Sequence, residues 1–137
     1  MPILIASFLY FLIVFGTGFF LGPIRILVLE PMLGPVAAVH CEVPLLIAVM
    51  VTAARWLPAK VRLPMTLTAL SLMGVGALVF QQFADFAVGV FIRGLTPSQI
   101  LATFATPAGA IYALSLAAIV AMPVLVHRQY LSPQTRR

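Results

Sequence analysis

Four stretches of this sequence run for about twenty residues almost without a charged side chain, at residues 3–22, 35–56, 64–86 and 107–126. A helix of ~20 apolar residues crosses the hydrocarbon core of a bilayer and satisfies its own backbone hydrogen bonds there. The sequence therefore predicts an all-α integral membrane bundle of four transmembrane helices. These spans use most of the 137 residues, so we expect one transmembrane domain over residues 1–137.

The composition and the start of the chain agree with this interpretation. Only 8% of the residues are charged and 63% are hydrophobic, whereas a soluble domain carries roughly 25% charged residues. The first apolar stretch lacks both a basic leader and a small-residue cleavage site, so we expect it to be retained rather than removed as a signal peptide. The single cysteine excludes an intramolecular disulfide.

Two pairs of glycines predict points of close helix packing. Gly18 and Gly22 form a G-x-x-x-G near the end of the first span, and Gly74 and Gly76 lie within the third. Glycines at such spacing let a neighbouring backbone approach closely. For the first pair the neighbour is either a second copy of the chain or another helix of the same chain. We favour the same chain, because four spans must pack together.

The segment between the first two spans is framed by prolines at 23, 31 and 35 but is otherwise apolar apart from Arg25 and Glu30. A solvated loop would be more polar, so we expect an interfacial or re-entrant piece, or a kinked extension of the first helix. Residues three or four apart are neighbours on a regular helix. Arg25 and Glu30 are five apart, so a regular helix would not bring them together.

Glu42 is an acidic residue inside the second apolar stretch, about 10 Å from its start at 1.5 Å per residue. Pro44 is expected to kink the helix there. Ionisable groups within a span are costly and are candidates for function. Two interpretations stay open: Glu42 binds a proton, a cation or a cationic group with Asp85 across from it, or it pairs with Arg25 and ties the connecting segment to the second helix. We favour the ion pair.

The run His40-Cys41-Glu42 raises the question of a metal site. Successive helix residues point about 100° apart, so these side chains cannot close on one ion from a regular helix, and we predict no metal. A haem with two histidine ligands from this chain is not expected, because His40 and His127 lie at opposite faces. His40 alone is a minor candidate ligand for a haem or chlorophyll-type pigment, with help from a partner. Cys41 is expected to be a small buried hydrophobe. No other cofactor is predicted.

The third apolar stretch turns amphipathic at two glutamines and Asp85, and its helix is expected to continue to about residue 92. The run Thr96-Pro97-Ser98-Gln99 then matches the signature of a helix start, with Thr at the cap, Pro at the first position and Gln three residues after the cap. We therefore expect a short interfacial helix over residues 97–105, before the last span.

The charged residues divide between the two sides of the predicted bundle. Six of the eight basic residues lie between the second and third spans or after the fourth, while the three acidic residues fall on the other side. By the positive-inside rule we expect both termini to be cytoplasmic. The basic residues on this side are Arg55, Lys60, Arg62, Arg128, Arg136 and Arg137. The outer face then carries a predicted polar cluster of Arg25, Glu30, His40, Glu42, Asp85 and Arg93.

The run GFFLGPIRILVLEPMLGP and the segments that follow it resemble a group of small proteobacterial inner-membrane proteins. The shared pattern is G-F-x-L-G-x-x-R, P-x-L/M-G, E-x-P early in the second helix and A-A-R at its end. Here these are residues 18–25, 31–34, 42–44 and 53–55, all in the first half of the chain. The resemblance implies a four-helix, multi-pass protein of the bacterial inner membrane, and it implies no activity.

No set of catalytic residues is present, because the sequence has no nucleophile–base–acid combination, no glycine-rich phosphate loop and no H-E-x-x-H. We therefore expect a protein that is not an enzyme, and favour an accessory or assembly subunit that packs on a larger inner-membrane complex. The alternative is a small oligomeric transporter or channel that uses Glu42 and Asp85. Expected partners are membrane lipids and other membrane subunits or further copies of the chain. Nucleic acid is not expected, since the distribution of the +5 net charge fits membrane orientation.

Overall fold

The structure, a computed structural model, describes residues 1–131 and contains only helices and connections over that range. Arg136 and Arg137, which entered the charge argument, lie outside the described residues. Four helical segments are long and apolar enough to cross a membrane, which confirms the predicted fold class: Pro2–Leu33, Pro35–Lys60, Leu67–Ile92 and Pro107–Arg128. With η marking a π-helical turn, the elements are α1 (Pro2–Ile24), η1 (Arg25–Leu29), α2 (Glu30–Leu33), α3 (Pro35–Lys60), α4 (Leu67–Ala87), η2 (Val88–Ile92), α5 (Pro97–Thr103) and α6 (Pro107–Leu131).

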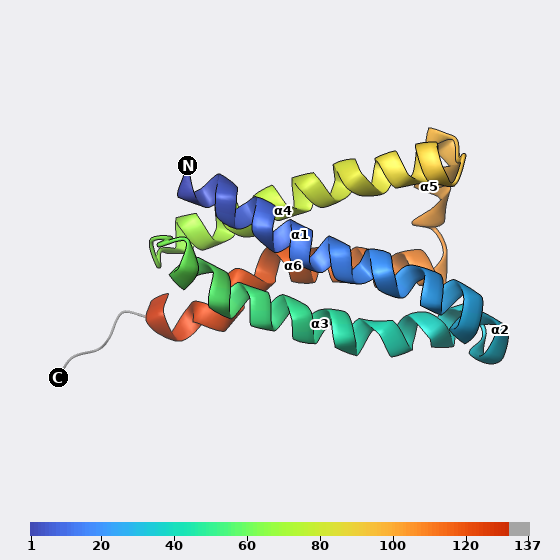
Figure 1. The fold of residues 1–137 in the computed structure, drawn as a ribbon, viewed down its shortest axis with the longest axis horizontal. Helices are drawn as coiled ribbons and strands as arrows, with labels where there is room; N and C mark the ends of the chain where they lie inside the picture. Colours follow the sequence, from blue (N-terminus) through green and yellow to red (C-terminus); the bar gives the residue numbers. More distant parts are fainter. Residues whose placement is uncertain (132–137) are drawn as a thin grey trace.

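The long helices form an up-and-down bundle (Figure 1). α1 and α6 each contact both α3 and α4, so the helices follow one another around the bundle in the order α1, α3, α6, α4. The chain begins, crosses from α3 to α4 and completes α6 at one end, which we call the terminal end. α2 and α5 lie at the other end, which we call the loop end (Figure 1).

The two halves of the chain share one order of elements. α1 and α4 each pass into a π-helical turn, and each turn leads to a short helix and then to a long helix that returns across the bundle. In η1 the amide of Glu30 bonds to the carbonyl of Arg25, and in η2 the amide of Arg93 bonds to the carbonyl of Val88. Both π turns therefore lie at the loop end, beside the charged residues.

The packed core occupies the terminal half of the bundle. Its buried side chains come mainly from the first halves of α1 and α4 and the second half of α3. Small residues at many of these positions let the helices approach closely, as is usual in membrane bundles. Large apolar side chains are exposed along the outside of the helices, which is the surface expected to face lipid. The members of this core cluster with no exposed surface include Ala6, Tyr10, Ala54, Leu70, Met73 and Ala77.

Gly74 and Gly76 are points of close packing, as predicted. A Cβ atom on Gly74 would collide with the backbone of Val120 in α6, and one on Gly76 would lie 2.8 Å from the Cβ of Ser7 in α1. The two glycines are neighbours in sequence but face different helices. Together they let α4 pack against α6 on one side and against α1 on the other.

The prediction of tight packing within the chain is wrong for Gly18 and Gly22. The nearest atom to a Cβ on Gly18 would be Leu46 Cδ2 at 3.9 Å, and a Cβ on Gly22 would meet nothing within 4 Å. Both glycines instead line a cavity at the loop end, because α4 diverges from α3 there. Their missing side chains add to the volume of that cavity.

α3 continues to Lys60, beyond the predicted end at residue 56, with Pro58 inside it. A proline lacks a backbone donor, so Pro58 leaves the carbonyl of Ala54 without its intrahelical partner. Nε2 of His127 in α6 donates a hydrogen bond to this carbonyl over 3.0 Å. The sequence predicted that the last span ends at residue 126, just before His127. The structure places it in the core, 6% exposed, because α6 extends to Leu131.

The capping box predicted before the interfacial helix is confirmed. The Thr96 hydroxyl accepts from the amide of Gln99 over 3.3 Å, and the Gln99 side chain accepts from the amide of Thr96 over 2.8 Å. α5 ends at Thr103, slightly earlier than predicted, because the next residues turn into α6. The hydroxyl of Thr106 then caps α6 by accepting from the amide of Gly109 over 3.0 Å.

Candidate functional site

A cavity of about 1150 Å³ lies at the loop end, with α1 and α3 on one side and α4, α5 and α6 on the other. The core residues Val14, Met50 and Ile119 line its inner end. Phe83 also lines it and is 73% exposed, so the cavity reaches the outer surface of the bundle beside α4, level with the polar residues of that helix. Most of the wall is apolar. The polar side chains on it are Arg25, Glu30, Glu42, Gln81, Gln82, Asp85, Arg93, Thr103, Tyr112 and Ser115.

Arg25 and Glu30 form an ion pair, contrary to the expectation from regular helix spacing. The distance from Arg25 Nε to Glu30 Oε1 is 3.3 Å. The physical reason is η1, in which hydrogen bonds join residues five apart and bring them onto one face of the helix. The segment after Pro23 is thus a continuous extension of the first helix, one of the alternatives considered from the sequence.

The predicted ion pair between Arg25 and Glu42 is present. Arg25 Nη1 donates to Glu42 Oε2 over 2.7 Å, and the side chains are 28% and 7% exposed. Gly34 makes this contact possible, because its φ of 84° lies in the left-handed region and turns the chain sharply into α3. One guanidinium therefore neutralises two carboxylates that are twelve positions apart in the sequence.

A second polar cluster joins α4 to α6 around Asp85. Nε2 of Gln81 donates to Asp85 Oδ2 over 2.9 Å, and the hydroxyl of Tyr112 donates to the same oxygen. Nε2 of Gln82 in turn donates to the Tyr112 hydroxyl over 3.4 Å. Sequence reasoning missed Tyr112. The available signal was a phenol inside an apolar span, since a tyrosine hydroxyl in such a place usually finds a hydrogen-bond partner.

The two clusters face the same cavity without touching each other. Among the described residues, no hydrogen bond or ion pair joins Arg25 or Glu42 to the cluster around Asp85. Gln81 is 8% exposed, and its Oε1 atom is buried without a hydrogen-bond partner in the described part of the chain. The Asp85 cluster therefore presents an unused acceptor at the cavity wall.

Three of the highlighted polar residues lie elsewhere or only at the edge. His40 is exposed and outside the cavity lining, and its Nδ1 donates to the carbonyl of Val36 one turn earlier in α3. Cys41 is also exposed, so the prediction of a buried thiol is wrong. Arg93 is exposed at the rim of the cavity and makes no ion pair with any residue in the range 1–131.

The cavity wall carries groups that can bind a charged or polar ligand group. In the described part of the chain, no three His, Cys, Asp or Glu side chains lie close enough to hold a metal ion. The cavity wall instead combines three carboxyl groups with two guanidinium groups, a phenol and amides. Such a set can hold a charged or hydrogen-bonding group while the apolar wall holds a hydrophobic one.

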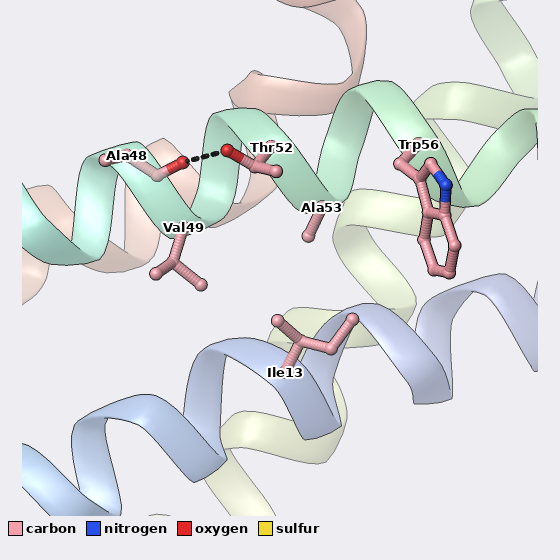
Figure 2. A pocket seen from close by; sticks show the side chains of 6 residues that line it. All are labelled: Ile13, Ala48, Val49, Thr52, Ala53 and Trp56. Atoms are coloured by element: carbon pink, nitrogen blue, oxygen red, sulfur yellow. Dashed lines mark hydrogen bonds between the residues drawn. The ribbon is translucent and has the colours of Figure 1, made fainter.

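A smaller depression of about 500 Å³ lies between α1 and α3, and its lining shares no residue with the loop-end cavity (Figure 2). Ile13 faces the α3 side chains Ala48, Val49, Ala53 and Trp56 across it (Figure 2). Thr52, its one hydroxyl-bearing residue, donates to the carbonyl of Ala48 over 2.8 Å. The depression is therefore a mainly apolar surface feature, and the indole N–H of Trp56 is its other polar side-chain group.

No known protein family, curated protein or solved structure matches this chain. The resemblance to small proteobacterial membrane proteins stays a prediction. The candidate site is therefore defined by its own geometry, and its function is inferred from that geometry.

Proposed function

We propose that this protein is a small oligomeric membrane transporter that binds its solute in the loop-end cavity. The observation that carries the proposal is that Glu42 and Asp85, from opposite sides of the bundle, line the same cavity. A mostly apolar cavity with a few convergent polar groups is the usual form of a small-molecule site between helices. Ionisable side chains within spans commonly mark ion and substrate pathways.

The shape of the cavity supports binding from one side of the membrane. The terminal half is closed by tightly packed side chains such as Tyr10, Met73 and Ala77. Transport therefore requires a second state in which this half opens and the loop end closes. Because four spans are few for an enclosed path, we infer that the working unit contains at least two copies of the chain.

We further propose that the membrane is the bacterial inner membrane, with the loop end outside and both termini in the cytoplasm. Lys60 and Arg62 lie in or beside the connection at the terminal end, which suits the positive-inside rule. The Lys60 ammonium lies 5.0 Å from the centre of the Trp56 ring. Such basic and aromatic pairs are typical of the bilayer interface.

Flux through the purified protein tests the proposal. Proteoliposomes loaded with pyranine report proton movement after an imposed pH gradient, and we expect faster dissipation than in protein-free liposomes. Glu42→Gln should abolish this excess flux. Glu42→Gln alone leaves Arg25 without this partner, which could disturb the fold. The double variant Arg25→Gln with Glu42→Gln removes both charges, so loss of flux in this variant, if it is well folded, is assigned to the missing carboxylate. Flux no faster than in protein-free liposomes would overturn the proposal.

The second candidate is an accessory subunit of a larger membrane complex, and the depression between α1 and α3 favours it. Small side chains such as Ala48 and Ala53 line this depression and would let a helix of another protein approach closely. Purification in mild detergent separates the two candidates. A pure homo-oligomer supports the transporter, while co-purification at fixed stoichiometry with a larger complex supports the accessory subunit.

A further inference from the structure

We propose that the loop-end cavity binds a phospholipid with a primary ammonium headgroup. This inference names the ligand class of the cavity in the proposed function and rests on that function only for the choice of site. The ammonium would lie against Gln81 and Asp85, the phosphate against Arg93, and an acyl chain along the apolar wall. Four observations lead to this assignment.

The first observation is that Gln81 and Asp85 have hydrogen-bond acceptor atoms for which the described residues supply no donor. Oε1 of Gln81 is buried and has no hydrogen-bond partner within residues 1–131, and the whole residue is only 8% exposed. Both hydrogen bonds that Asp85 receives from described residues end on Oδ2. An ammonium carries three donors and no acceptor, so it would complement an amide oxygen and a carboxylate oxygen at once.

The second observation is an unpaired cation beyond these acceptors. Arg93 follows Asp85 by eight positions, or about 12 Å along a helix at 1.5 Å per residue. Arg93 is an exposed residue of the cavity lining and has no ion pair among residues 1–131. A guanidinium binds phosphate with two parallel hydrogen bonds. A headgroup links ammonium and phosphate by a short chain, so both contacts require the long Arg93 side chain to extend back toward Asp85, the direction in which helical side chains point.

The third observation is the depth of the acceptors. Asp85 lies seven residues before the end of the span at Ile92, or about 10 Å along the helix. The headgroup region of one leaflet extends over several ångströms outside a hydrocarbon core that is ~30 Å thick. The polar groups are therefore placed near the boundary between headgroups and acyl chains, where the head of a bound lipid would lie.

The fourth observation is the apolar wall and its opening. Phe15 and Leu78 line the cavity on the terminal side of the polar groups, and a water-soluble solute would gain little from them. Phe83 lines the cavity while being 73% exposed, so the opening reaches the lipid-facing side of α4. An acyl chain could enter there from the bilayer without leaving hydrocarbon.

Stepwise methylation of the headgroup tests the role of the N–H donors. Native mass spectrometry of the full-length protein would compare phosphatidylethanolamine, its monomethyl and dimethyl forms, and phosphatidylcholine with the same acyl chains. We expect retention to fall along this series, by about tenfold overall, because each methyl group removes a donor from hydrogen bonds to charged acceptors. Equal retention of phosphatidylethanolamine and phosphatidylcholine by the wild-type protein would overturn the proposal.

Variants then assign the preference to the named residues. Gln81→Met keeps side-chain length without the acceptor, and it should lower binding of phosphatidylethanolamine toward the level of phosphatidylcholine. Arg93→Gln should weaken both lipids alike, because both carry the phosphate. Thr52→Val, in the separate depression between α1 and α3, is the matched control and should change neither. A Gln81→Met protein that unfolds at the wild-type temperature and keeps the full preference would contradict the assignment.

Binding is measured without a gradient, so it is independent of flux. Selective binding of phosphatidylethanolamine without proton flux would uphold this inference and overturn the proposed transport function. Proton flux without selectivity among the four lipids would overturn this inference and uphold the proposed transport function.

Discussion

Arg25 neutralises two carboxylates through different nitrogen atoms. Its Nε atom lies 3.3 Å from Glu30 and its Nη1 atom 2.7 Å from Glu42. A guanidinium can do this because its donors project in fixed directions from a planar group, whereas an ammonium is a compact point charge. The ion pairs connect η1, α2 and α3, so this one side chain holds the sharp turn at Gly34 against the second span.

The two contacts of Arg25 predict that lysine will not replace it. Arg25→Lys should lower the free energy of unfolding by about 1–2 kcal/mol, because one ammonium cannot meet both carboxylates in their present places and the Glu42 side chain is only 7% exposed. Thermal unfolding in detergent measures this change. Each single charge reversal, Arg25→Glu or Glu42→Arg, should also destabilise the protein. Combining the two should restore stability only in part, since the new carboxylate at position 25 would face Glu30. Adding Glu30→Gln should complete the rescue, and failure of this triple variant would contradict the pairing.

His127 predicts a coupling with Pro58 in unfolding experiments. His127→Ala should cost about 1–3 kcal/mol, because the buried carbonyl of Ala54 loses its donor. In a Pro58→Ala background the amide of residue 58 can bond to that carbonyl within α3, so the same change should cost about 1 kcal/mol less. A double-mutant cycle measured by reversible unfolding in mixed micelles gives this difference. Strictly additive effects would show that the two residues act independently.

At the scale of elements, the π turns decide which residues meet. A regular helix would have separated Arg25 from Glu30, and η1 brings them together by adding one residue to the turn. η2 ends the third span in the same way and turns the chain toward α5. Both turns accompany a change of direction at the loop end, where the helices separate and the cavity forms.

Helix contacts predict opposite effects for two glycines. Gly74→Ala should destabilise the protein by at least about 2 kcal/mol, since the added Cβ would collide with the backbone of Val120 and a backbone cannot rotate away. Gly16→Ala is the matched control, because its Cβ would meet nothing within 4 Å. It should be neutral or stabilising by up to about 1 kcal/mol. Thermal stability in detergent compares them, and equal effects would exclude the close contact between α4 and α6.

At the scale of the whole molecule, packing is uneven. The core lies in the terminal half, whereas the loop half surrounds the cavity. Regions with few buried contacts open with lower free energy than packed cores. The end that carries the candidate site is therefore the end most able to change its shape when a ligand binds.

The arrangement of the four spans predicts labelling from opposite sides of the membrane. In a Cys41→Ser background, cysteines introduced by Lys60→Cys and by Ser98→Cys lie at the terminal end and the loop end respectively. A membrane-impermeant maleimide should label Ser98→Cys in intact cells and Lys60→Cys only after the membrane is opened. Labelling of both positions from the same side would refute the four-span arrangement.

Several features could be predicted before any packing was known: the number of spans, the capping box before α5 and the gathering of acidic residues at one end. These features depend on local properties, namely the length of apolar runs, the residues at a helix start and the order of charges along the chain. The ion pair of Arg25 with Glu42 was also predictable, because few partners exist for a charge in such surroundings.

The rotation of each helix about its axis, and the point at which the helices separate, could not be predicted in this way and follow from packing. Helix rotation brings the Tyr112 hydroxyl into hydrogen-bond contact with Asp85. It also turns Gly18 and Gly22 toward the cavity rather than toward a neighbouring helix, and it leaves His40 and Cys41 exposed. It also brings His127 to the carbonyl that Pro58 leaves free. The physical reason is that in lipid both faces of a span are apolar, so hydrophobic periodicity, which reports the buried face of a helix in water, carries little information about helix rotation.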